Sequence, residues 1–183
     1  MNEPRPIPLL PPDIEQPTDL VAAIRARRGG ELLKLDRMLL HSPALAHGWN
    51  VYLGKVRGEL SVPARLKELA MCAVAVLNGA HYEYEHHAPL YIQEGATAEQ
   101  AQAILEMEQA NFPLGLFPEE DQDALALARA MTRDILVPGS LKRRMLKRHG
   151  PQQVVELVAV IATYNMVSRF LVALDIHTEY DEE

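Results

Sequence analysis

The 183-residue sequence predicts an all-α fold of about eight helices. In almost every segment, apolar residues recur at the three- and four-residue spacing of a helix rather than at the alternation of a strand. Start and stop signals, mainly Ser, Thr and Pro before helices and Gly after them, recur about every fifteen residues. The length suits one compact domain, which we place at residues 18–183, after an N-terminal arm at 1–17.

The arm holds six of the thirteen prolines of the chain. It has neither a basic start nor a sustained apolar stretch, so it does not have the pattern of a secretory signal. We expect it to run extended over the surface of its own subunit or of a neighbouring one.

Three helices are expected after the arm. Thr18 can cap the first, which ends at Gly29-Gly30. A second is expected from Glu31 to about His41. Ser42 and Pro43 then supply an N-cap and a first-turn proline for a third helix that ends near Gly58.

The central helix is expected to begin after Pro63. Its residues 69–77 are apolar on every side, which predicts burial all round. Asn78-Gly79 indicates a break, after which a further helix runs to Gly95. Pro89 lies within that helix and is expected to kink it.

The remaining helices begin at recognisable caps. Residues 97–100 match a capping box, and Pro118 starts the next helix, which ends before Pro138. Ser140 opens a short basic helix that Gly150 stops, and the last long helix runs from residue 151 to about 174. The basic run within 142–148 is expected to form a solvated face.

A weak internal echo relates residues 63–69 to 151–157, each with a proline followed five residues later by Glu-Leu. An ancient duplication or chance would explain it. At the same offset, Leu171 corresponds to Glu83 and Asp175 to His87. A duplicated second copy would thus have lost the polar residues, and chemistry would belong to the first copy.

Composition excludes several functional classes. The formal net charge of −7 argues against a nucleic-acid partner, because binding to phosphates relies on Lys and Arg. No apolar run approaches the roughly 20 uncharged residues of a membrane-spanning helix, so no membrane partner is expected. The single cysteine, Cys72, allows no intrachain disulfide or thiolate cluster and fits a reducing, cytoplasmic location.

The densest cluster of titratable side chains lies at residues 81–87, directly after the most apolar helix. Glu83 and His87 are one helical turn apart and share a face, whereas His81 and Glu85 share a different one. A carboxylate beside an imidazole can fix its tautomer and favour its action as a general base near neutral pH. The alternative is that these charges form a solvated helix surface.

Glu68 strengthens the case for a site. It lies among Leu66, Leu69 and Ala70, where a carboxylate without a partner would be costly to bury. His87 is the obvious partner, so we predict that Glu68, Glu83 and His87 converge on one semi-buried pocket.

These residues carry a family resemblance. Glu68, Ala80, Glu83 and His87 stand at the Glu, Cys, Cys and His positions of the motif E-x11-C-x2-C-x3-H of AhpD-like alkyl hydroperoxidases. Both cysteines of that motif are replaced here. The run Glu-Tyr-Glu-His-His at 83–87 is more similar to the E-F-E-M-H run of the carboxymuconolactone decarboxylase branch. The resemblance covers most of residues 31–175 and is most specific at 63–95.

The resemblance implies an AhpD-like helical bundle and an enzyme that acts by proton transfer on a small carboxylated lactone or enol acid, without a cofactor. It implies His87 as the acid or base, with Glu68 and Glu83 orienting it. A cation should hold the substrate carboxylate, and Arg65 or Arg169 can do so. The residues expected to bind substrate are Arg65, Tyr84, Asn165 and Arg169.

Other functions stay open at this stage. A thiol peroxidase of the AhpD kind needs a resolving cysteine, which the chain lacks. A non-catalytic oligomer that binds a small ligand is the third possibility.

His81, Glu85 and His86 have the spacing to donate to a metal, but with no fixed third ligand elsewhere we expect no metal site. Family members commonly form rings, so a homo-oligomer, a trimer or hexamer, is expected.

Overall fold

The computed structural model describes residues 7–177, and within that range it contains eight α-helices and no strand. The predicted all-α fold is therefore confirmed. The described chain divides into two compact units, residues 7–60 with 174–177 and residues 61–173. The division into an arm at 1–17 and a domain at 18–183 stays a prediction; residues 1–6 and 178–183 lie outside the described range.

The first unit contains α1 (Thr18–Arg28), α2 (Lys34–Leu39) and α3 (Pro43–Gly58). Gly29 ends α1 in the left-handed conformation, with φ 86°, as a C-terminal glycine does in many helices. Helix α2 is shorter than expected, because the carboxylate of Asp36 accepts the N–H of Leu33 and fixes the start of the helix one residue later.

The described part of the arm lies against helices of its own unit. Arg25 donates to the carbonyl oxygen of Pro12 over 2.7 Å. The His41 ring bonds to the carbonyl oxygen of Pro8 over 2.8 Å, and Arg37 donates to that of Leu10. These side chains satisfy backbone oxygens that an extended proline-rich segment cannot pair within itself.

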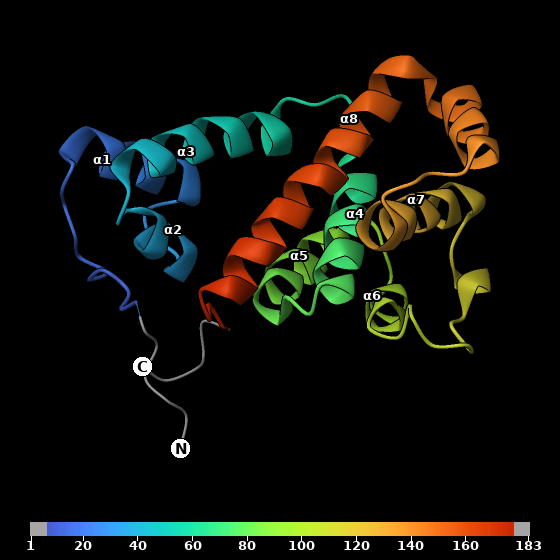
Figure 1. Ribbon diagram of the computed structural model, residues 1–183, viewed down its shortest axis with the longest axis horizontal. Helices are drawn as coiled ribbons and strands as arrows, with labels where there is room; N and C mark the ends of the chain where they lie inside the picture. The colour runs from blue at the N-terminus through green and yellow to red at the C-terminus, as the bar shows by residue number, and fades with distance from the viewer. Residues whose placement is uncertain (1–6, 178–183) are drawn as a thin grey trace. The chain divides into compact units, whose positions relative to one another are not determined.

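The second unit is built around α4 (Ala64–Leu77), which packs against α5, α7 and α8 (Figure 1). The side chains from Leu69 to Ala75 have no exposed surface. The predicted burial on every side is therefore confirmed for residues 69–75, whereas Val76 is partly exposed. Because neighbours surround α4, any polar group on it must find its partner within the protein.

A sharp turn separates α4 from α5 (His81–Gln93). Gly79 adopts φ 69°, a conformation that costs glycine little, and the helix expected to break there does so. Helix α5 continues through Pro89 as one element. The two polar segments of the sequence, one on α4 and one on α5, thus lie on adjacent packed helices.

The next elements are α6 (Ala98–Ile104), a 3₁₀ turn η1 (Leu114–Leu116), α7 (Glu119–Arg129) and a π-helical turn η2 (Ala130–Asp134). The capping box at the start of α6 is confirmed. Gln100 N–H donates to Thr97 Oγ1 and Thr97 N–H donates to Gln100 Oε1, each over 3.0 Å.

Helix α8 (Gly139–Ala173) consists of two helical stretches joined at Gly150, which has φ 72° and ψ 172°. The second stretch begins at Pro151, as the sequence predicted. Glu156 on this stretch caps the start of α4, since its Oε2 accepts the N–H groups of Ser61 and Val62 over 2.7 and 3.0 Å.

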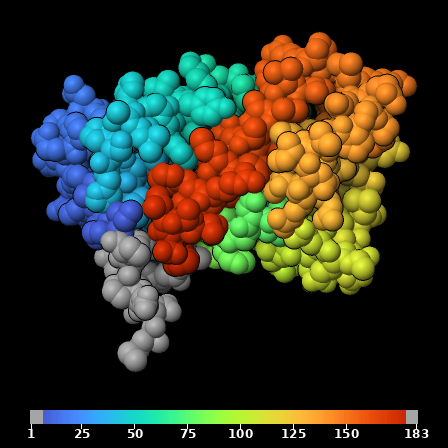
Figure 2. Space-filling view, in the orientation of Figure 1, coloured from blue at the N-terminus to red at the C-terminus, as the bar shows by residue number. Residues whose placement is uncertain are grey.

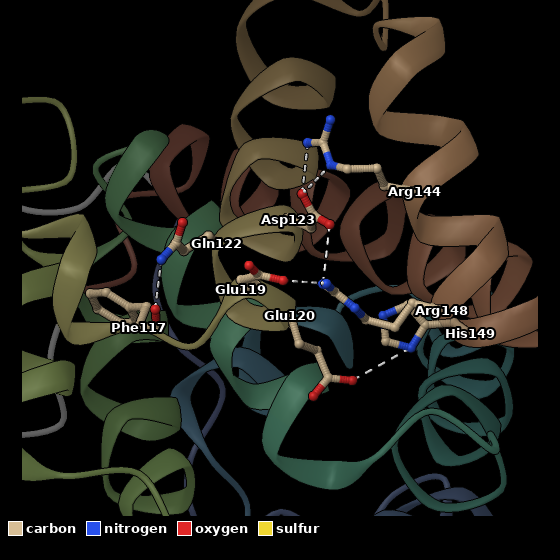
Figure 3. Close-up of polar contacts among 8 residues, drawn as sticks. All are labelled: Phe117, Glu119, Glu120, Gln122, Asp123, Arg144, Arg148 and His149. Carbon is tan, nitrogen blue, oxygen red and sulfur yellow. Dashed lines mark hydrogen bonds and ion pairs between the residues drawn. The ribbon is translucent and has the colours of Figure 1, made fainter.

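The basic run at the start of α8 is only partly a solvated face. Arg144 and Arg148 both donate to the carboxylate of Asp123, which is nearly buried on α7, and Arg148 also reaches Glu119 (Figure 3). His149 lies 3.6 Å from Glu120 beside them. These ion pairs therefore link the first stretch of α8 to α7. The charge pattern of the sequence alone does not indicate this contact.

Among the described residues, α8 alone is long and apolar enough to cross a membrane by length and composition. Half of its most apolar stretch is buried, and Val160, Ile161 and Leu171 have almost no exposed surface. A core helix passes the same test, so this is weak evidence for a membrane span. Its opposite flank lies at the surface of the second unit (Figure 2).

Candidate functional site

The structure brings Glu68 of α4 and His87 of α5 into direct contact. His87 Nδ1 lies 2.6 Å from Glu68 Oε2, and the two side chains are 12% (Glu68) and 6% (His87) exposed. The predicted meeting of these two residues is therefore found. A buried carboxylate on the apolar helix and a buried imidazole on the next one satisfy each other.

This contact sets the orientation and tautomer of the imidazole. A carboxylate accepts, so Nδ1 carries the hydrogen in the pair, and the lone pair of a neutral ring lies on Nε2. The edge of Tyr164 from α8 packs on the ring, with centroids 4.9 Å apart and planes at 86°. Glu68 of α4 thus bonds to one nitrogen of His87, and Tyr164 of α8 packs against its ring.

Glu83 is buried with them but has a different partner. It is 2% exposed, and its Oε2 lies 2.9 Å from the hydroxyl of Ser168 on α8. Its other oxygen, Oε1, has no hydrogen-bond partner among the described residues. Burial raises the pKa of Glu83 well above its usual value. The sequence offered Glu68 as a partner of His87 because of its burial and Glu83 because of its spacing; the structure pairs Glu68 with His87 and Glu83 with Ser168.

Cys72 lies one turn beyond Glu68 on α4 and has no exposed surface. Burial raises the pKa of its thiol, and the nearby carboxylate of Glu68 raises it further. A thiol with a raised pKa and no access to solvent is a poor nucleophile. The expectation of a small buried hydrophobic side chain describes it well.

Arg65, expected as one of two clamps for a substrate anion, forms a two-pronged ion pair with Asp121 of α7. Arg65 Nη1 lies 2.8 Å from Asp121 Oδ1, and Nη2 contacts Oδ2. The guanidinium also lies over the Tyr91 ring, 5.8 Å from its centroid. Because Asp121 is fully buried, this pair is a structural link between α4 and α7.

Asn165, also expected to bind substrate, uses all of its hydrogen-bonding capacity within the protein. Its amide nitrogen donates to Thr132 Oγ1 and to the Ile161 carbonyl, both over 3.0 Å. Its oxygen accepts from Asn78 and from Arg169, both over 3.1 Å. Two donors and two acceptor sites are occupied, so the geometry favours a structural role. Arg169 is exposed and keeps further donors for an anion.

Tyr84 lines a cavity of about 210 Å³ on another side of α5. Its hydroxyl donates to the carbonyl of Ala101 over 2.7 Å, and burial raises its pKa to about 12. The residues that line the cavity come from α4, α5 and the segment after α6: Ala75, Val76, Ala80, His81, Tyr84, Leu105, Glu108 and Gln109. Glu68, Glu83 and His87 do not line it, so the cavity and the acid–imidazole pair are separate features.

The residues considered for a metal do not come together. His81 and Glu85 are exposed, and the Nδ1 of half-buried His86 bonds to the Tyr82 carbonyl over 2.8 Å. Between residues 7 and 177, no three His, Cys, Asp or Glu side chains are grouped so as to hold a metal ion. The described chain offers no further ligand to complete such a set.

Sequence reasoning missed two residues of the site, Tyr164 and Ser168. They are one helical turn apart on α8, and the Ser168 hydroxyl also lies 2.7 Å from the Tyr164 carbonyl. The available signal was this spacing on the buried side of α8, where the polar side chains of Thr163 and Asn165 are buried as well. Their role depends on α8 packing against α4 and α5, which is a tertiary contact.

Comparisons with known proteins agree with this fold. The model of the carboxymuconolactone decarboxylase family matches residues 43–130, which include Glu68, Glu83 and His87. No curated protein sequence matches at a significant level.

Two solved structures share the fold. One is an uncharacterized peroxidase-related protein from Silicibacter sp. TM1040, with TM-score 0.78 and 16% identity over 98% of this chain and 94% of its own. The other is a cysteine-to-alanine variant of the debrominase Bmp8 in complex with 2,3,4-tribromopyrrole. It has TM-score 0.78 and 18% identity over 97% of this chain and 95% of its own.

Proposed function

The chain belongs to the carboxymuconolactone decarboxylase family, and from this premise we propose that it is an acid–base enzyme acting on a small carboxylated lactone or enol acid. The observation that carries the proposal is the buried hydrogen bond between Glu68 and His87. It joins two helices in an apolar core. Apolar side chains of similar volume often stabilise such a core equally well, so the presence of the polar pair favours a chemical role.

The pair suits proton transfer. Glu68 fixes the ring of His87 and stabilises the imidazolium that forms when the ring accepts a proton. When a carboxylated lactone loses carbon dioxide, the electrons of the broken C–C bond remain as a dienolate, which must then take up a proton. A positioned acid next to a buried imidazole supplies what this step requires.

Thiol chemistry of the peroxidase kind is the alternative function. A dithiol cycle requires two cysteines, and the chain has one. That cysteine is fully buried, with a raised pKa. The solved structures of the peroxidase-related protein and of the debrominase share only 16% and 18% sequence identity with this chain, so they support the fold alone. The geometry therefore favours acid–base chemistry.

Turnover tests the proposal directly. The purified protein is incubated with carboxymuconolactone and with related small lactones and enol acids that carry a carboxylate, and carbon dioxide release is followed. We expect release from at least one of them, and a loss of about 10²- to 10⁴-fold in His87→Ala. His47→Ala is the matched control, because His47 is an exposed histidine of α3 in the other unit.

Each outcome is informative. Full turnover in His87→Ala places the chemistry elsewhere. Saturable binding of these acids without any turnover, in the wild-type protein, supports a non-catalytic ligand-binding protein instead. Loss of turnover only when Cys72 is replaced supports the thiol alternative.

A further inference from the structure

The contacts of Ser168 contain one more hydrogen-bond acceptor than its hydroxyl can serve. Its Oγ lies 2.9 Å from Glu83 Oε2 and 2.7 Å from the carbonyl oxygen of Tyr164. A serine hydroxyl has one hydrogen to donate, and a carbonyl or an ionised carboxylate can only accept. If Glu83 were ionised, one of the two short contacts would join two acceptors with no hydrogen between them.

A neutral Glu83 supplies the hydrogen that the second contact needs. The hydroxyl of the acid donates from Oε2 to Ser168 Oγ, and Ser168 donates its own hydrogen to the Tyr164 carbonyl one turn earlier, as helical serines often do. Both contacts are then hydrogen bonds. The chain of donors runs from Glu83 on α5 through Ser168 to the backbone of α8.

The surroundings of Glu83 favour the same state. The described residues offer it no Arg or Lys partner, and Oε1 has no donor. The thiol of Cys72 on α4 lies near it, and His87, one turn along its own helix, is paired with Glu68. An ionised carboxylate with a single donor in a nearly closed site is costly, whereas a neutral one is tolerated.

We propose that Glu83 is held as a neutral carboxylic acid that donates its hydrogen bond to Ser168, and that it is the proton donor of the reaction, with Ser168 as its positioning residue. This rests on the proposed function and assigns within it the group that supplies the proton.

The C–C bond to the substrate carboxylate breaks, carbon dioxide leaves, and its electron pair stays on the substrate as a dienolate. The O–H bond of Glu83 then breaks as a C–H bond forms, which leaves Glu83 as a carboxylate. A proton from water restores the acid, so the net reaction consumes one proton and releases one carbon dioxide.

The protonation state can be measured without any substrate. Infrared spectra at neutral pH should contain a protonated-carboxyl band in the wild-type protein that is absent in Glu83→Gln. The glutamine can still donate an N–H to Ser168, so it preserves the packing of the acid. The matched control is Glu85→Gln, two positions along the same helix at an exposed site, and it should keep the band.

Ser168→Ala distinguishes positioning from simple packing. If Ser168 accepts the proton of Glu83, the band should move in frequency in Ser168→Ala while its area and the helical circular dichroism stay unchanged. A purely structural serine would leave the frequency in place. Where a site variant fails to fold, ¹³C-carboxyl glutamate resonances of the wild-type protein give the same answer, with one glutamate still protonated at neutral pH.

Several results would overturn the inference: no protonated carboxyl in the wild-type protein at neutral pH, a band that survives in Glu83→Gln, or no frequency change in Ser168→Ala. A protonated Glu83 in a protein without turnover contradicts the proposed function and leaves the protonation state established. Turnover that is unchanged in Glu83→Gln shows that another group donates the proton.

Discussion

His87 Nδ1 and Glu68 Oε2 lie 2.6 Å apart between two helices, and both side chains are nearly closed to solvent. The two residues are 19 positions apart in sequence, and the turn at Gly79 lies between them. The pair therefore joins α4 to α5 as well as setting the imidazole.

Removing one member of this pair should cost stability. Glu68→Ala leaves a buried ring nitrogen without its partner, which we expect to lower the free energy of unfolding by about 1–3 kcal/mol in urea titrations. In Glu68→Ala/His87→Ala the loss should be smaller than the sum of the single losses, because neither partner is then left alone. Additive losses would mean that the two side chains do not interact.

The stability of the protein should depend on Glu83 in a definite direction of pH. Burial raises the folded-state pKa of Glu83 above the value of 4.5 that applies to the unfolded chain. Between these two pH values, Glu83 is protonated in the folded state but ionised in the unfolded chain. Its contribution to the free energy of unfolding is therefore greatest below pH 4.5 and falls as the pH rises toward the folded-state pKa.

Denaturation at several pH values measures this dependence. Relative to Glu83→Gln, the unfolding free energy of the wild-type protein should fall by about 1.4 kcal/mol per pH unit as the pH rises from 4.5 toward the folded-state pKa. Glu85→Gln should run parallel to the wild-type protein, because its side chain is exposed. A wild-type curve parallel to that of Glu83→Gln would show that Glu83 is ionised when folded.

Cys72 should be dispensable for the reaction. Cys72→Ser places a hydroxyl among apolar groups and should lower stability by about 1–3 kcal/mol while turnover is kept. In the native wild-type protein the thiol should react with a thiol reagent only as fast as the protein unfolds. Cys72→Ala controls for the lost volume. Abolished turnover with an intact fold in both variants would favour the thiol alternative.

Arg65 should matter to stability more than to substrate affinity. Arg65→Met leaves the fully buried Asp121 without its cation, which we expect to cost about 3 kcal/mol in unfolding free energy. Arg129→Met is the control, because Arg129 pairs with Glu108 at the surface and should change stability by less than about 0.5 kcal/mol. A raised KM with unchanged stability in Arg65→Met would instead assign Arg65 to the substrate anion.

The chain is expected to self-associate. Helix α8 carries exposed apolar side chains at Val155, Val158 and Met166, which follow helical spacing. Light scattering should give a mass above the 20.4 kDa of one chain, and Val155→Glu should lower it. Gln102→Glu adds the same charge at another exposed position and should leave the mass unchanged. A monomeric wild-type protein at micromolar concentration would contradict this expectation.

The sequence by itself determined most of the helices and several of their ends, because these depend on neighbouring residues. The capping box at Thr97 and Gln100 works as the local pattern requires, and Gly79 takes the conformation that a break needs. The apolar run in α4 likewise predicted burial on all sides, since no face of it carries polar side chains beyond its first turns. Glu68 stood out because it interrupts that pattern, and its energetic need for a partner led to His87.

Only the tertiary structure decided what holds Glu83. Spacing along α5 places Glu83 one turn from His87, but helix packing brings Ser168 of α8 to Glu83. Likewise, nothing near Arg65 in the sequence points to Asp121, which lies 56 residues further on. Hydrogen bonds between helices depend on crossing geometry and burial, which arise from many contacts at once and leave no local pattern.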